Sequence, residues 1–94
     1  MREATHKFLF LEPVKFRRDG NPGYAIRDLL ESAHASVTVY TVSSHHGQTI
    51  EEQFRELAHS VLDVDAKDQP GAKTLRLVQV GANKANIPIV GRLK

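Results

Sequence analysis

The side chains best suited to chemistry gather in one short stretch that follows a β-branched run. The stretch contains Ser43, Ser44, His45, His46, Gly47 and Thr49. Helix-period apolar residues begin at Ile50, so these side chains precede or open an expected helix. Hydroxyl groups, imidazolium rings and the free backbone N–H groups of a helix start all bind phosphate. The stretch therefore predicts a phosphate-binding loop, although a solvated polar loop accounts for the same residues.

The sequence carries no signature of a catalytic or metal centre. Nucleophilic catalysis by Ser43 or Ser44 needs a base and an orienting acid, and no G-x-S-x-G elbow is present. Cysteine is absent, which excludes disulfides and thiolate ligands. The histidines lack the H-x-x-x-H and H-E-x-x-H spacings that place two of them on one metal ion. We therefore assign no catalytic residue, no metal ligand and no cofactor.

Positive charge is concentrated at the two ends of the chain. The net charge is +3 over residues 1–18, −6 over 19–66 and +5 over 67–94. The candidate binding residues of these ends are Lys15, Arg17, Arg18, Lys73, Arg76, Lys84 and Arg92. If both ends belong to one sheet, they form a basic strand surface for nucleic acid or an acidic protein. Nucleic-acid surfaces usually add exposed aromatic rings, but the candidates Phe16 and Tyr40 are expected in the core.

Local patterns predict the elements that would position these groups. Strands are expected over 6–11, 36–43, 74–80 and 87–93, and helices over 22–34 and 50–62. Residues 14–18 either continue the first strand or form a strand of their own. Thr49 and Glu52 fit a capping box at the start of the second helix, and Glu51 with Arg55 fits a favourable i, i+4 ion pair.

Two of these strands have an expected place in the sheet. Phe8 and Phe10 alternate with Leu9 and Leu11, and apolar residues on both faces predict a buried rather than an edge strand. The last strand, 87–93, contains a proline without an N–H and a glycine without a side chain. We therefore expect it at an edge, antiparallel to its neighbour.

The order of elements predicts the fold class. Strands alternating with helices indicate a small single α/β domain over residues 1–94, with a mixed, mostly parallel sheet of about four strands and two helices (β-α-β-α-β-β). The two helices cover either one face of the sheet or both. The longest apolar run, Phe8 to Leu11, is too short to cross a bilayer, and no export signal is recognised. We therefore expect a cytoplasmic protein without a membrane partner.

Three functions fit these features. The favoured one is a non-enzymatic binding module that offers its basic strand surface to an anionic partner, either nucleic acid or an acidic protein. One alternative is a small phosphate- or phosphoryl-handling enzyme with its site at Ser43–Thr49. The other is a structural subunit of a homo-oligomer that pairs through the C-terminal edge strand.

Overall fold

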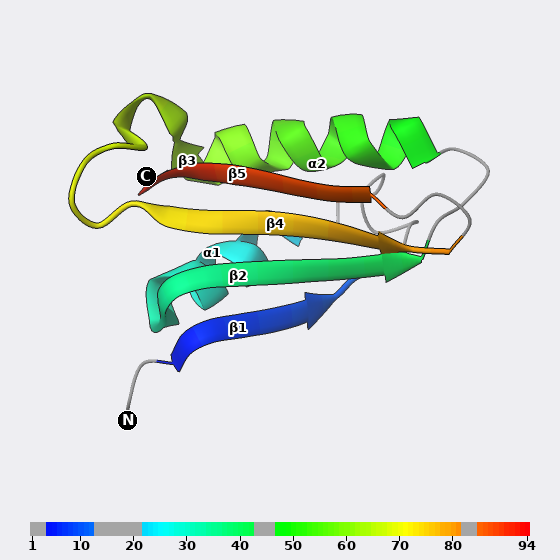
Figure 1. Ribbon diagram of the computed structural model, residues 1–94, viewed down its shortest axis with the longest axis horizontal. Helices are drawn as coiled ribbons and strands as arrows, with labels where there is room; N and C mark the ends of the chain where they lie inside the picture. The colour runs from blue at the N-terminus through cyan, green and yellow to red at the C-terminus, as the bar shows by residue number, and fades with distance from the viewer. Residues whose placement is uncertain (1–3, 13–21, 43–46, 82–84) are drawn as a thin grey trace.

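The computed structural model describes residues 4–12, 22–42, 47–81 and 85–94 (Figure 1). The elements in chain order are β1 (Ala4–Phe10), α1 (Pro22–Ser32), β2 (Ala33–Val42), α2 (Gly47–Val61), β3 (Leu62–Asp63), the 3-10 turn η2 (Val64–Ala66), β4 (Lys73–Val80) and β5 (Ala85–Leu93). The predicted α/β class is confirmed, because two helices accompany one mixed sheet. Whether residues 14–18 form a strand is a question that lies outside the described residues.

The sheet has the strand order β1-β2-β4-β5-β3. β1, β2 and β4 are parallel, since each connection between them crosses over through a helix. β5 runs antiparallel to β4, as predicted, and β3 runs antiparallel to β5. The prediction of about four mostly parallel strands is corrected in both respects. The described sheet has five strands, and two of its four pairings are antiparallel.

Both helices pack on the same face of the sheet, which answers a question that the sequence left open (Figure 1). The chain moves from β1 to β2 to β4 in one direction, and successive right-handed crossovers in one direction place their helices on one side. The core consists of inward-facing strand residues and the apolar stripes of the helices. Its largest fully buried side chains include Phe54, Ile26, Leu30, Leu75 and Leu77.

β1 lies at an edge of the sheet and not in its interior, contrary to the prediction. Leu9 and Leu11 face the helices and pack in or against the core. Phe8 and Phe10 point to the other face, where their side chains are 59% and 60% exposed. Apolar residues on both faces of β1 predict that both faces are covered, but the two helices lie over only one of them.

β5 has β3 beyond it in the strand order, but β3 pairs only with Arg92 and Leu93, so among the described strands the rest of β5 has the predicted edge position. β3 was not predicted: it has only two residues, too few to show a period. Pro88 is tolerated because β3 reaches no further than Arg92, so β4 is the only described strand that pairs with Pro88. Gly91 permits the close approach of β3, since a Cβ at this position would lie 2.6 Å from the carbonyl oxygen of Asp63.

The second helix starts earlier than predicted. α2 begins at Gly47, so Thr49 lies within its first turn and the predicted cap at Thr49 is wrong. The helix thus begins two residues before Thr49, the residue at which the sequence predicts its cap. The predicted ion pair is confirmed, with 3.2 Å between Arg55 Nη2 and Glu51 Oε1.

Candidate functional site

The face of the sheet that points away from α1 and α2 is the candidate functional site. We call it the open face, and it consists of His6, Phe8 and Phe10 of β1, Ser36, Thr38, Tyr40 and Val42 of β2, Thr74, Arg76, Val78 and Val80 of β4, and Asn86, Pro88 and Val90 of β5. These positions alternate along the strands with the buried positions of the core. No described helix packs over them (Figure 1).

The open face holds most of the exposed large hydrophobic side chains of the described residues. Their exposed large hydrophobic side chains number six, and Tyr24 of α1 is the only one that lies elsewhere. The other five are Phe8, Phe10, Val42, Val80 and Val90. Single exposed apolar side chains are ordinary, whereas contiguous patches mark interaction surfaces. The grouping of five on one face therefore indicates a surface that contacts another molecule.

The rings of His6, Phe8 and Tyr40 on β1 and β2 are in contact on this face. Phe8 and Tyr40 are stacked, with ring centroids 5.7 Å apart and planes inclined by 29°. The His6 ring meets Phe8 edge-on at 4.5 Å. Phe10 is the direct cross-strand neighbour of Tyr40. Such ring pairs stabilise by ~0.5–1.5 kcal/mol beyond burial, so Phe8 is held in place although its outer surface is exposed.

His6 is itself fixed by polar contacts to β2. Its Nε2 shares a hydrogen bond of 2.9 Å with Thr38 Oγ1, and its Nδ1 hydrogen-bonds to Ser36 Oγ. Thr38 is buried beneath its neighbours, so this contact lies in the floor of the open face. The imidazole therefore braces Phe8 from one side while Tyr40 supports it from the other.

Arg76 supplies positive charge at the middle of the open face. It lies in β4, in the same cross-strand row as Thr38 of β2 and Pro88 of β5. Its Nη1 donates a hydrogen bond of 2.8 Å to Asn86 Oδ1, which uses one of the five N–H donors of the guanidinium. No open-face position carries a carboxylate, so an approaching anion meets no opposing charge on the strands around Arg76.

The other two basic candidates that the structure describes, Lys73 and Arg92, make contacts away from Arg76. Lys73 lies on the helix side of β4 and donates to the carbonyl oxygen of Leu30 at the end of α1. Arg92 lies at the end of β5, where its Nη1 donates to Gln69 Oε1 at 3.3 Å. Arg76, Lys73 and Arg92 therefore occupy three separate places, and the described part of the chain does not join them into one basic strand surface.

The remaining candidates from the sequence are only partly described. Gly47 is the first residue of α2 and Thr49 lies in its first turn. Outside the described residues lie Ser43, Ser44, His45, His46, Lys15, Arg17, Arg18 and Lys84. The predicted phosphate-binding loop and most of the N-terminal basic cluster are thus not placed.

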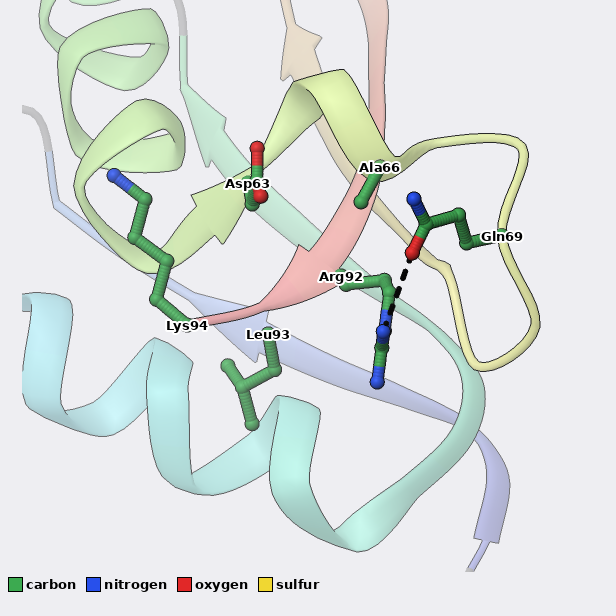
Figure 2. Close-up of a pocket in the computed structure, with 6 residues that line it drawn as sticks. All are labelled: Asp63, Ala66, Gln69, Arg92, Leu93 and Lys94. Carbon is green, nitrogen blue, oxygen red and sulfur yellow. Dashed lines mark hydrogen bonds between the residues drawn. The ribbon is translucent and has the colours of Figure 1, made fainter.

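A pocket of about 260 Å³ opens where β3, η2 and the end of β5 meet (Figure 2). It is lined by Asp63, Ala66, Gln69, Arg92, Leu93 and Lys94. In Figure 2 the Lys94 side chain extends away from Arg92, and the Asp63 carboxylate also points away from the guanidinium. The charged groups diverge and have mixed sign, so they do not form one anion site.

The described residues contain no group of three or more His, Cys, Asp or Glu side chains that could hold a metal ion. Among the described helices, none is long and apolar enough to cross a membrane. Comparison with family models, with curated proteins and with solved structures gave no match. The functional argument therefore rests on the geometry of the open face.

Sequence reasoning missed Phe8 and Phe10, which are the two most exposed large hydrophobic side chains of the site. The available signal was the alternation of β1 itself, which shows that phenylalanines and leucines lie on opposite faces. The missing information was the strand order. Once β1, β2 and β4 are adjacent in that order, both crossover helices lie over the leucine face and the phenylalanine face is left open.

Proposed function

We propose that the protein is a non-enzymatic binding module whose open face binds an anionic partner. One observation carries the proposal: five exposed apolar side chains share the open face with Arg76, and none of the described positions of that face carries a carboxylate. The apolar part favours a contact surface, and Arg76 sets the sign of the charge that the partner carries. A cytoplasmic location remains a prediction from the sequence.

The charge of the whole chain supports an anionic partner. The formal net charge is +2 and the isoelectric point is about 9.2. A chain with this charge attracts polyanions over roughly one Debye length, about 8 Å at physiological salt. The long-range attraction is weak, so affinity and orientation depend on contacts at the open face. This division of roles is typical of interfaces in which charge accelerates encounter and buried side chains hold the complex.

The test compares two charge-neutralising variants on a heparin column. Arg76→Gln removes the cation of the open face, whereas Arg55→Gln removes an exposed cation of α2 that pairs with Glu51. Both variants lower the net charge by one, so non-specific attraction falls equally. We expect Arg76→Gln to elute at distinctly lower salt than Arg55→Gln. Equal elution of the two variants would mean that the anion does not bind at the open face.

The enzyme and the homo-oligomer alternatives stay predictions. The phosphate-handling hypothesis depends mainly on Ser43 to His46, which lie outside the described residues. The oligomer hypothesis assumed that residues 87–93 form a free edge. In the described sheet β3 pairs with the end of that strand, so only the part before Arg92 offers unpaired backbone groups on that side.

A further inference from the structure

We infer that the anionic partner is single-stranded nucleic acid, with bases stacked on Phe8 and Phe10 and a backbone phosphate at Arg76. The inference rests on the proposed function, because it identifies the partner of the same open face. It follows from three features: the exposure of the two rings, the contacts that hold Phe8 in place and the position of Arg76 relative to the rings.

The phenyl rings offer the surface that an unpaired base needs. Phe8 and Phe10 are each more than half exposed, whereas Tyr40 on the neighbouring strand is partly buried. Stacking of a base on an aromatic side chain contributes ~1–3 kcal/mol and tolerates any base, because every base has a π-face. The stack with Tyr40 and the edge contact with His6 hold Phe8 in place before binding. Less side-chain freedom is then lost when a base arrives.

Arg76 lies where the backbone of a stacked strand passes. Phe8 is paired with Thr38, and Thr38 is paired with Arg76. Neighbouring strands are ~4.8 Å apart, which puts Arg76 about 10 Å across the sheet from Phe8. A nucleic-acid strand that stacks on β1 and continues over β2 therefore brings its phosphates to the guanidinium. The guanidinium has five N–H donors, one of which bonds to Asn86, and arginine is well suited to phosphate.

A second copy of the chain is a poor partner for the open face. Two open faces packed together would bury each Arg76, and neither face offers a carboxylate to pair with it. Burying an arginine without a partner costs several kcal/mol, which offsets much of the gain from covering the apolar side chains. A phosphate backbone brings a negative charge for Arg76 together with flat apolar bases for the rings.

The carboxylates of an acidic protein can pair with Arg76, but they do not bind favourably to the faces of the phenyl rings. The face of a phenyl ring carries the negative part of its quadrupole, so a carboxylate above Phe8 or Phe10 is repelled. Duplex DNA is also a poor match, because its bases are already stacked and paired and are not free to lie on a phenylalanine. Unpaired nucleotides combine the required charge with exposed base faces.

The experiment titrates ¹⁵N-labelled protein with oligo(dT) of about eight nucleotides, with a duplex of similar length and with polyglutamate. Affinity for labelled oligo(dT) is measured by fluorescence anisotropy on wild type, Phe8→Ala, Phe10→Ala and Tyr24→Ala. Tyr24 is the matched control, since it is 69% exposed but lies on α1. All the variants are first compared by circular dichroism, because exposed rings can be removed without unfolding the chain.

We expect oligo(dT) to shift the amides of β1, β2 and β4 and to bind more tightly than the duplex or polyglutamate. Each phenylalanine substitution should weaken binding about 5- to 140-fold, which corresponds to the ~1–3 kcal/mol of one stacked base. Tyr24→Ala should bind like wild type. Equal loss in the Tyr24 and phenylalanine variants would overturn the inference.

The probes separate failure of the inference from failure of the proposed function. If polyglutamate shifts the open face and oligo(dT) does not, the proposed function stands and the nucleic-acid inference is wrong. If no anion shifts the open face, both are wrong. If the open-face amides shift on dilution of the protein alone, the face is an interface between copies and both are again wrong.

Discussion

Whether Gly91→Ala raises or lowers the stability of the protein depends on one close contact. Gly91 lies in β5 and does not have a positive φ, so its backbone accepts an alanine. In open space the substitution would stabilise the protein by ~0.4–1 kcal/mol, because alanine restricts the unfolded chain. A Cβ at this position, however, would lie 2.6 Å from the Asp63 carbonyl oxygen and 3.1 Å from Val64 Cα. These are backbone atoms, which cannot move aside by a change of rotamer.

The contact therefore requires β3 to shift. Overpacking of this kind costs ~1–3 kcal/mol. If β3 releases β5, the backbone hydrogen bonds between these two antiparallel strands are weakened as well, at ~1 kcal/mol each. We expect a net loss of about 1–3 kcal/mol after the gain from the unfolded chain is subtracted. In a chain of this length each kcal/mol lowers Tm by ~4–8 °C.

The assay is urea unfolding followed by circular dichroism, with hydrogen exchange of the Lys94 amide as a local readout. Lys94 N–H donates to the Val61 carbonyl oxygen at 2.9 Å, next to the shifted strand, so its exchange should accelerate in the variant. Val90→Ala is the control, because Val90 belongs to the same strand but points to the open face. A Gly91→Ala protein that is more stable than wild type would refute the close approach of β3 to β5.

Three further predictions concern the core, the surface and the loop. Phe54→Ala should destabilise the protein by ~3–5 kcal/mol in thermal unfolding, because the ring is fully buried between α2 and the sheet; a cost below ~1 kcal/mol would contradict its place in the core. Glu51→Gln should cost at most ~0.5 kcal/mol and nothing at high salt, because its ion pair with Arg55 is exposed; a salt-independent cost would show another role. The phosphate-binding loop predicted from the sequence is tested by calorimetry with inorganic phosphate. Binding should weaken as pH rises through the range where histidine loses its charge, and it should be lost in His45→Ala/His46→Ala. Binding that does not depend on pH would argue against a role of imidazolium.

The helices and the strands β2 and β4 could be predicted because their signals are local. The spacing of Ile26 and Leu30, and of Phe54 and Ala58, fixes one apolar stripe on each helix, and both stripes are buried. A two-residue strand such as β3 has no period of its own. It exists because the absence of a side chain at Gly91 lets another part of the backbone come close, which is a tertiary effect.

The candidate site could be predicted only in part, for a related reason. Arg76 was identified from its charge, which is visible in the sequence. The exposure of Phe8 and Phe10 depends on which face the helices cover, and this depends on strand order rather than on any local pattern. The sequence predicts Lys73 and Arg92 beside Arg76, but alternation along β4 puts Lys73 on the helix side, and Arg92 lies at the far end of β5, where it donates to Gln69.

The most direct test of the open face is the detection of intermolecular nuclear Overhauser effects between oligo(dT) and the aromatic rings. Base stacking places thymine protons next to the ring protons of Phe8 and Phe10, while Tyr24 on α1 stays remote from the nucleotides. We predict contacts from thymine H6 and methyl protons to Phe8 and Phe10, together with upfield ring-current shifts of the thymine signals. Contacts confined to α1 or α2 at saturating oligonucleotide, or no contact to either phenylalanine, would contradict binding of single-stranded nucleic acid at the open face.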